Sequence, residues 1–414
     1  MDIKAFKGFR PRSNYSSQVA SRPYDVLDSD EARLEAKGNP YSFLNVVKPE
    51  ITLTNDIDPY SEQVYEAGKR NFQTLIDQDV FIQDETDCLY IYELTMDGRS
   101  QSGIVACAAV EDYMQGKIKK HELTRPDKET DRKNHVRISM LNAEPVFFAY
   151  QSQEILDQLI ESEKQALPVY DFITDDGIQH RFWVIKNDTT INSIVDIFSQ
   201  MNETYVADGH HRTAAAALVG NDLKAENPSH QGTEEYNYFL AVHFPDNQLQ
   251  IFDYNRVVKD LNGHTAESLI EAISKSFDIN LIGKEIFKPK ELHEIGMYLD
   301  GNWYKLQAHP DVYNDNDPID VLDVTALSKQ ILEPLLDIKD LRTDKRIEFV
   351  GGIRGLKELK RRVDSGEMAV AFAMYPVSMK QLMDIADNDL IMPPKVTWFE
   401  PKLRSGLVVH SLIE

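Results

Sequence analysis

The chain has 414 residues and a formal net charge of −23, with 42% hydrophobic and 27% charged residues. This length supports two or three domains with a substantial core, and the composition is ordinary for a soluble globular protein. The acidic balance argues against a broad nucleic-acid surface, although a local group of donors can still bind phosphate. Neither a signal peptide nor a run of 18 apolar residues is evident, so we expect a cytoplasmic protein without a membrane partner. Cys88 and Cys107 lie in apolar, strand-like segments and are expected to be buried, reduced thiols.

Taken in chain order, the first half predicts alternating helices and strands. Ser29 or Asp30 is expected to cap a short helix through Lys37, and residues 61–78 have the pattern of an amphipathic helix. Two β-rich runs around a glycine-containing polar loop predict a hairpin over residues 88–110. The other elements expected here are strands at 145–150, 181–186 and 204–207 and a helix near 152–165.

The second half of the chain predicts further helices and strands and contains no internal repeat. The segments YFLAVHF and LQIFDYNRVV, residues 238–244 and 249–258, are expected to pair as another hairpin. The remaining expected elements are helices at 264–277, 324–338 and 379–389, a buried strand at 368–378, and a proline-rich loop that enters a last strand. The whole pattern predicts a mixed α/β (α+β) fold with several packed subdomains.

A basic turn lies within ETYVADGHHRTAAAALVG, residues 203–220. The apolar residues before the turn predict the end of a buried strand, and the alanine run after it predicts a helix. Gly209 can adopt the positive φ that a sharp strand-to-helix turn requires. His210, His211 and Arg212 then occupy the first helical turn, where backbone N–H groups and the helix dipole favour anions. We therefore predict a phosphate-binding turn, with a purely structural junction as the alternative.

Two other segments concentrate polar side chains. KKHELTRPDKETDR, residues 119–132, contains a His-Glu pair among lysines and arginines, and MPPKVTWFEPKLRSG, residues 392–406, is a proline-stiffened loop with two lysines and a threonine. Each segment has a plain alternative as a solvated surface. The His-Glu pair is not a zinc-protease helix, because Arg125 stands where the second histidine of that motif is needed.

A zinc site is a weaker interpretation of the histidines. His121, His210 and His211 are the candidate ligands, but adjacent histidines seldom both bind one metal ion. The chain also lacks a Walker-type glycine-rich motif, a Rossmann fingerprint and a local pattern for a nucleophilic cysteine. The motifs by themselves therefore indicate a phosphate-binding turn together with an acidic group.

YVADGHHRTAAA resembles the phosphate-binding turn of the ParB/sulfiredoxin-like superfamily, and its Asp-Gly-His-His-Arg form is similar to that of the archaeal free-serine kinase. KKHEL resembles that kinase's His-Glu pair, and SGEMAVAFAMYPVS and PPKVT are similar in order and spacing to its C-terminal part. The whole chain resembles a longer bacterial branch of the superfamily that is catalogued as a domain of unknown function, family ten-fifteen. His210 stands where sulfiredoxins require a cysteine, and the DNA-binding elements of ParB proteins are not evident.

The resemblance implies a ParB/sulfiredoxin-like, phosphate-binding core over residues 116–262. An N-terminal α+β region at 1–115 and a C-terminal α/β region at 263–414 would complete the protein and its substrate site. The implied activity is phosphoryl transfer from ATP, ADP or diphosphate to the hydroxyl of free L-serine, which gives O-phosphoserine. A nucleotide-binding, ParB-like regulator without catalysis is the alternative, and a purely structural protein would explain neither polar segment. A homodimer is expected only because dimers are the commonest oligomers of soluble proteins.

The implied site assigns a role to each polar segment. Glu122 would be the catalytic base beside His121, and Asp208 would either hold Mg²⁺ or orient the serine hydroxyl. The residues assigned to the donor phosphates are Gly209, His210, His211, Arg212 and Thr213. The residues assigned to the serine substrate are Lys395 and Thr397, with Thr124, Arg125 and Arg132 as further candidates.

Overall fold

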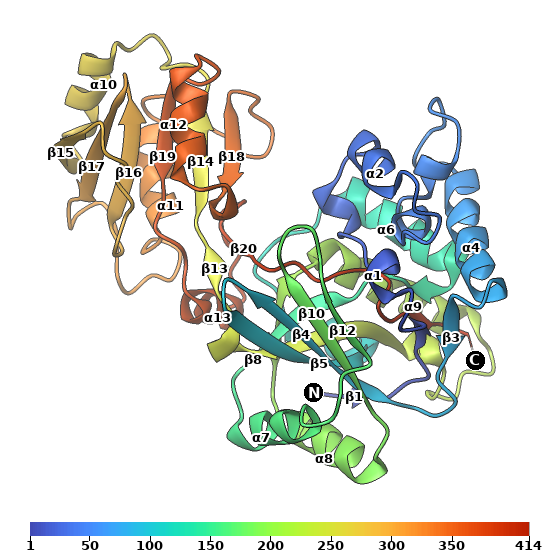
Figure 1. Ribbon diagram of the computed structural model, residues 1–414. Coiled ribbons are helices and arrows are strands. Elements are labelled where there is room, and N and C mark those ends of the chain that lie inside the picture. Colours follow the sequence, from blue (N-terminus) through green and yellow to red (C-terminus); the bar gives the residue numbers. More distant parts are fainter. Residues whose placement is uncertain (414) are drawn as a thin grey trace. The chain divides into compact units, whose positions relative to one another are not determined.

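The computed structural model describes residues 1–413, and their mixture of helices and strands confirms the expected α+β class (Figure 1). The chain divides into two compact units, and each is described separately. Unit 1 consists of Met1–Leu249 and Pro401–Glu414, and unit 2 consists of Gln250–Glu400. Unit 2 is therefore inserted between the two pieces of unit 1. The domain boundaries after residues 115 and 262 stay a prediction.

Unit 1 is built on a nine-stranded mixed sheet. Its strands are β1 (Ile3–Lys4), β4 (Leu89–Met96), β5 (Arg99–Ala109), β6 (Ile118–Lys119), β8 (Val146–Tyr150), β9 (Tyr170–Ile173), β10 (Gln179–Ile185), β11 (Thr204–Asp208) and β12 (Tyr238–Pro245). Their order is β6-β11-β8-β12-β5-β4-β10-β9, and β1 pairs with β5. The pairs β6–β11 and β8–β12 are parallel, and the other pairs are antiparallel. The hairpin predicted over 88–110 is confirmed as β4 and β5.

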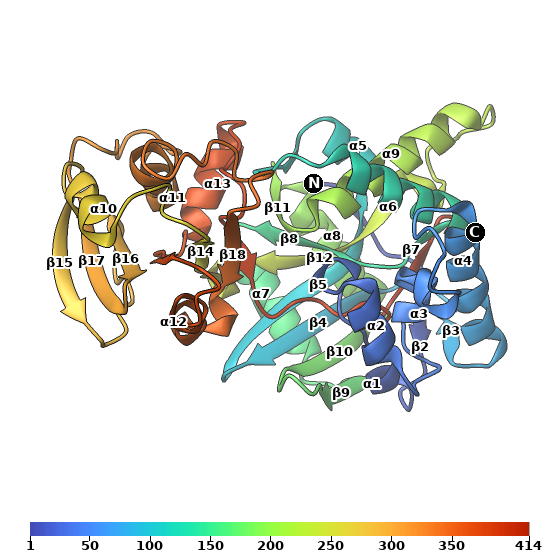
Figure 2. The ribbon, with the colours of Figure 1, turned by 90° about the horizontal axis from the view of Figure 1, so that it is seen from above.

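The helices of unit 1 flank this sheet and its edges (Figures 1 and 2). They are α1 (Ser16–Val19), α2 (Ser29–Ala36), α3 (Leu44–Val47), α4 (Glu62–Asp77), α5 (Val110–Met114), α6 (Pro126–Ser139), α7 (Glu154–Glu163), α8 (Asp188–Ser199) and α9 (His210–Glu226). Two further strand pairs, β2 (Phe9–Pro11) with β3 (Phe81–Gln83) and β7 (Leu141–Asn142) with β21 (His410–Ser411), lie outside the main sheet. The cap of α2 is Asp28, which forms a capping box with Glu31, and not Ser29 or Asp30 as expected.

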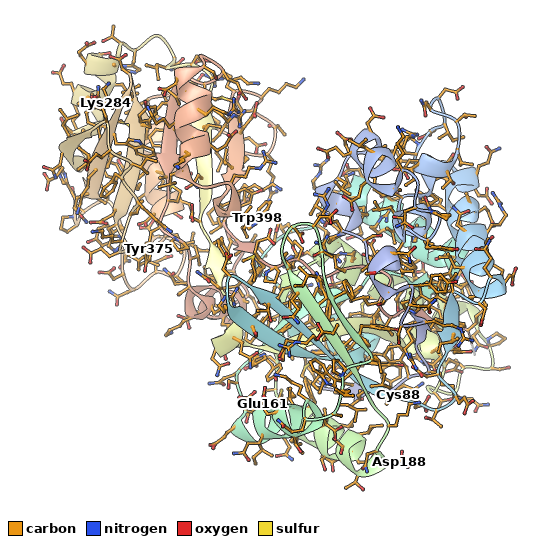
Figure 3. All side chains as sticks on the ribbon, in the orientation of Figure 1. Cys88, Glu161, Asp188, Lys284, Tyr375 and Trp398 are labelled. Carbon is orange, nitrogen blue, oxygen red and sulfur yellow. The ribbon has the colours of Figure 1, made fainter. Side chains whose placement is uncertain are left out.

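The main core of unit 1 joins the sheet to helices. Ile104 and Phe148 of the sheet are fully buried in one apolar cluster with Leu156 of α7, Ile194 of α8 and Ala217 of α9. A second cluster packs the helices near the N-terminus together. Both cysteines are buried, as expected, and neither forms a disulfide; Cys88 is labelled in Figure 3. Within residues 1–413, no helix has the length and apolar character that a bilayer span requires.

Unit 2 contains its own six-stranded antiparallel sheet. The strands of unit 2 are β13 (Ile251–Phe252), β14 (Tyr254–Val258), β15 (Phe277–Gly283), β16 (Glu294–Leu299), β17 (Asn302–Ala308), β18 (Ile347–Gly351), β19 (Val370–Ala373) and β20 (Trp398–Phe399). The sheet order is β15-β17-β16-β19-β14-β18, and β13 pairs separately with β20. Its helices are α10 (Ala266–Ile273), α11 (Asp323–Leu327), α12 (Leu356–Asp364) and α13 (Met379–Asp387).

Two predictions for the second half of the chain were wrong. The expected hairpin of 238–244 with 249–258 does not form: β12 pairs with β5 and β8 in unit 1, whereas β14 pairs with β18 and β19 in unit 2. The boundary between the units falls in the loop that was taken for a hairpin turn. The helix expected over 324–338 is also shorter. The α-helix α11 ends at Leu327, and the chain continues as a π-helical turn only to Leu332. Pro334 follows, and a proline disfavours the helical conformation of the residue before it.

Candidate active site

The predicted basic turn lies between β11 and α9 in unit 1. Gly209 has φ 92° and ψ 34° and is the N-cap residue of α9, which confirms the positive φ expected there. Glycine has no side-chain oxygen with which to cap the helix, so the N–H groups of the first turn need acceptors from elsewhere. A phosphate group is one such acceptor, and the helix dipole favours its negative charge.

Arg212 folds back over this turn and is buried, with 7% of its surface exposed. Its guanidinium donates a hydrogen bond from Nη1 to the carbonyl oxygen of Pro145 at 2.8 Å, and Nη2 lies 3.4 Å from Oδ2 of Asp208 and 4.0 Å from Asp25. Burial lowers the pKa of Arg212, but the nearby carboxylates outweigh burial and raise it overall. Arg212 therefore stays charged inside the protein.

Asp208 lies between two cationic side chains. Its Oδ2 is 3.4 Å from Arg212 and 3.5 Å from Nζ of Lys402, which belongs to the C-terminal piece of unit 1. Burial raises the pKa of Asp208, but Lys402 and Arg212 outweigh burial and hold the pKa below its ordinary value. Asp208 is therefore an ionised carboxylate whose charge is already balanced.

The surroundings of Asp208 bear on Mg²⁺, which prefers several oxygen ligands in octahedral geometry. Asp208 forms ion pairs with two cations at the turn, Lys402 and Arg212, and these compete with a divalent ion for the same oxygen. The contacts of Asp208 thus fit an orienting role better than the role of a sole protein ligand for Mg²⁺.

The parallel pairing of β6 with β11 brings the His-Glu pair to this turn. Ile118 is the register partner of Thr204, and Lys119 is the register partner of Tyr205. Because parallel strands end at the same edge of a sheet, the residues after β6 emerge beside those after β11. The polar segments 119–132 and 203–220 therefore meet at one edge, although residues 133–202 separate them in the sequence.

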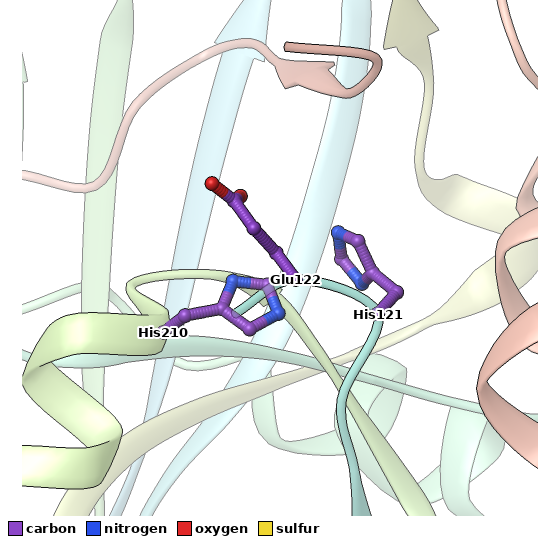
Figure 4. Close-up of side chains that lie close together, drawn as sticks. All are labelled: His121, Glu122 and His210. Carbon is purple, nitrogen blue, oxygen red and sulfur yellow. The ribbon is translucent and has the colours of Figure 1, made fainter. Parts of the chain in front are cut away.

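Figure 4 shows the three side chains that meet there: His121, Glu122 and His210. One potential ligand atom from each lies within 4.8 Å of the others. The two imidazole rings are nearly perpendicular, with centroids 4.5 Å apart, and both histidines are buried, whereas Glu122 is half-buried. Burial lowers the pKa of His121 to about 4 and lowers the pKa of His210 well below its ordinary value, so both rings are neutral at pH 7.

His211 has a different environment from its neighbour His210. Successive residues of an α-helix point about 100° apart, and His211 Nε2 accepts a hydrogen bond from the backbone N–H of Arg125 at 2.9 Å. This contact joins the start of α9 to the start of α6. The two adjacent histidines therefore make different contacts.

The other residues predicted near the His-Glu pair make local contacts. The hydroxyl of Thr124 donates to Glu129 at 2.7 Å, and the exposed guanidinium of Arg125 pairs with Asp127 at 2.7 Å. The hydroxyl of Thr213 donates to the carbonyl oxygen of Gly209 at 3.0 Å, within the first turn of α9. Their assignments to substrate or donor stay predictions.

Arg132 is buried, in contrast to the solvated surface that its charge-rich segment suggested. Its guanidinium lies 3.9 Å from the ring centroid of Tyr24, pairs with Asp131 at 2.9 Å and lies 3.7 Å from Glu144. Together with Arg212, Arg132 and Glu144 line a cavity of about 30 Å³, which has room for one or two water molecules and not for a serine. Arg132 thus makes its ion pairs inside the protein, and its assignment to the substrate stays a prediction.

Lys395 and Thr397 lie in unit 2, and their assignment to the serine carboxylate stays a prediction. Lys395 is exposed, has φ 59°, and its ammonium lies 6.0 Å from the ring centroid of Tyr254. No local pattern in the sequence indicates a role for Lys402, Asp25 or Glu144 at the turn. Lys402 was visible as a cation in the proline-rich loop, but nothing local in the sequence indicates that it pairs with Asp208.

Fold and site together define an α+β protein with a basic strand-to-helix turn beside a His-Glu pair. A family model matches residues 3–325, so the chain belongs to the DUF1015 family, which is described as a protein of unknown function. The expectation of this family is confirmed. A comparison with curated proteins finds no match.

Several solved structures are distantly similar to the chain. A free serine kinase variant in complex with AMP has 11% identity and a TM-score of 0.38, covering 73% of this chain and 92% of that chain. SbnI with a C-terminal truncation, from Staphylococcus aureus, has 12% identity and a TM-score of 0.39, covering 73% and 85%. A conserved hypothetical protein from Pyrococcus furiosus has 15% identity and a TM-score of 0.37, covering 74% and 95%. The ParB/sulfiredoxin-like nature of the core stays a prediction.

Proposed function

We propose that this chain is a phosphotransferase that moves a phosphoryl group from ATP, ADP or diphosphate to the hydroxyl of free L-serine, forming O-phosphoserine. The observation that supports the proposal is the meeting of Glu122 with the Gly209 turn at the ends of two parallel strands. Phosphorylation of an alcohol requires a base for the hydroxyl and a preorganised site for the donor phosphates. Glu122 supplies the first requirement, and the start of α9 supplies the second.

In the proposed reaction Glu122 accepts the proton of the serine hydroxyl. The serine oxygen bonds to the terminal phosphorus of the donor, and the bond from that phosphorus to its bridging oxygen breaks. The bridging oxygen leaves with the electron pair, so that ATP yields ADP, ADP yields AMP and diphosphate yields phosphate. The proton on Glu122 is then released to solvent.

The donor phosphates are proposed to bind at the start of α9. The backbone N–H groups of His210, His211 and Arg212 are the proposed donors to the phosphate, and the cationic side chains of Arg212 and Lys402 lie at the same turn beside Asp208. Asp208 is proposed to orient these two cations and the serine hydroxyl. Mg²⁺, when bound to the donor, neutralises part of the phosphate charge.

A direct assay tests this proposal. The purified chain is incubated with L-serine, Mg²⁺ and ATP, ADP or diphosphate in parallel, and O-phosphoserine is measured by mass spectrometry. We expect product with at least one donor, and we expect Glu122→Gln to lower kcat by roughly 10²–10⁴-fold, because the base is lost. Glu111→Gln is the matched control, since Glu111 is exposed on α5 and removing its charge leaves kcat unchanged.

Other outcomes distinguish the alternatives. Turnover of Glu122→Gln within a few-fold of the parent would remove Glu122 from the role of base. No product with any donor, combined with nucleotide binding that survives in Glu122→Gln, would indicate a nucleotide-binding regulator.

A further inference from the structure

The side chains of His121, Glu122 and His210 form a compact group of nitrogen and oxygen donors. One donor atom from each lies within 4.8 Å of the other two, and in Figure 4 the ring of His210 points toward His121 with Glu122 beside both. The two histidines expose only 2% and 7% of their surfaces. The group therefore consists of two buried imidazoles with a carboxylate at the boundary with solvent.

A second observation concerns a buried nitrogen of this group. Among residues 1–413, Nε2 of His210 is buried without a hydrogen-bond partner. Buried polar atoms in folded proteins are nearly always paired with protein, water or a bound ion. A cation held between the imidazoles would satisfy such a nitrogen.

We propose that His121, Glu122 and His210 bind a divalent transition-metal cation of the zinc class. Two imidazole nitrogens and one carboxylate oxygen are the donor set of open zinc sites, whereas Mg²⁺ prefers oxygen donors throughout. With metal–ligand bonds of about 2.0–2.2 Å, ligand atoms in a tetrahedral complex lie roughly 3.4 Å apart. The three ligand atoms, which lie within 4.8 Å of one another, would have to move closer together to reach that spacing. A water molecule or a substrate oxygen would take the fourth position.

This site goes beyond the proposed phosphoryl transfer, because the three side chains bind the cation in the absence of the phosphoryl donor and of the serine acceptor. It also predicts an effect on that reaction. A cation on Glu122 takes up the lone pair that would accept the serine proton, so zinc-class cations are expected to inhibit phosphorylation that Mg²⁺ supports.

Cobalt absorption provides a readout that is independent of activity. The full chain is freed of metal with a chelator and titrated with Co²⁺, whose visible absorption becomes strong in a four-coordinate site with nitrogen ligands. We expect one Co²⁺ per chain, displaced by an equimolar amount of Zn²⁺ and not by a hundredfold excess of Mg²⁺. His210→Ala is expected to lower the affinity at least tenfold and to abolish the visible bands.

A neighbouring variant and a conservative one complete the experiment. His211→Ala is the matched control, because His211 bonds to the backbone of Arg125, and its removal should leave the Co²⁺ affinity within about twofold. Glu122→Gln keeps the shape of a half-buried side chain and should also weaken binding at least tenfold, even if His210→Ala fails to fold. Equal affinity in the parent and Glu122→Gln, or no stoichiometric binding by the parent, would overturn the site. Metal binding without any O-phosphoserine would retain the site and overturn only the proposed reaction.

Discussion

At the scale of single residues, Gly209 meets two independent requirements of the turn. Its φ of 92° lies in the left-handed region, where a residue with a Cβ is strained by roughly 1–2 kcal/mol. A Cβ built at this position would also lie 3.1 Å from two nitrogens of the Arg212 guanidinium. Glycine therefore permits both the sharp turn and the return of Arg212 over it.

Substitution of two glycines separates the requirement for a positive φ from the requirement for space beside Arg212. Gly209→Ala and Gly38→Ala both place alanine at positive φ, but the space around Gly38 is open. We expect each to lower the free energy of unfolding, with a loss at Gly209 larger by roughly 1 kcal/mol because Arg212 must move. Urea denaturation of the two variants measures the difference. Equal losses would show that Arg212 shifts freely and does not need glycine beneath it.

At the scale of elements, β12 places a histidine in the apolar interior of unit 1. His243 is fully buried, and its ring packs edge-on against Phe148 and Phe198, with ring centroids 5.4 and 5.1 Å apart. Within residues 1–413, neither nitrogen of His243 has a hydrogen-bond partner. Burial, with a smaller contribution from the charged N-terminus, lowers the pKa of His243 to about 3. The folded state therefore holds this imidazole neutral.

The pH dependence of stability follows from that pKa. Between pH 6.5 and 3 the unfolded chain binds a proton at His243 that the folded chain does not, so stability falls as pH falls through this window. We expect His243→Leu to reduce the slope of unfolding free energy against pH near pH 5 by up to about 1.4 kcal/mol per pH unit. Urea denaturation at pH 7, 6, 5 and 4.5 measures the slope. An unchanged slope would mean that His243 is protonated in the folded protein.

At the scale of the whole molecule, unit 2 has the features of an independently folding insertion. Its six-stranded sheet and its buried cluster around Val257, Trp303 and Leu359 belong entirely to residues 250–400. Its two ends are paired through β13 and β20, and Trp398 covers Tyr254 with ring centroids 5.1 Å apart. Adjacent termini and a separate core are the marks of a domain that can be inserted within another.

We expect residues 250–400, produced alone, to fold with a single cooperative transition in urea, followed by circular dichroism. A shorter segment of residues 254–396 lacks β13, β20 and Trp398 and serves as the comparison. It should unfold at a lower urea concentration, because the ring of Tyr254 and the face of Gly351 lose the indole that covers them. Absence of a cooperative transition in the longer segment would show that unit 2 depends on the rest of the chain.

Local chemistry in the sequence predicted much of the secondary structure and the centre of the site. The helix predicted over residues 61–78 is confirmed as α4, and the hairpin predicted over 88–110 is confirmed as β4 and β5. Gly209 has the positive φ that was expected. Each of these features depends on residues within one or two turns of chain, so the sequence determines them directly.

Only the tertiary structure decided which distant segments meet. The sequence placed 238–244 beside 249–258, but strand pairing is set by long-range burial, and the two segments belong to different sheets. The parallel pairing of β6 with β11, which joins Glu122 to the Gly209 turn, involves two short strands far apart in the chain, as does the ion pair of Lys402 with Asp208. The sequence by itself thus determined the class of the fold and the basic turn, because these follow from local conformational preference. The partners of that turn, and the choice of His210 over His211 beside His121, were decided by the packing of the folded chain.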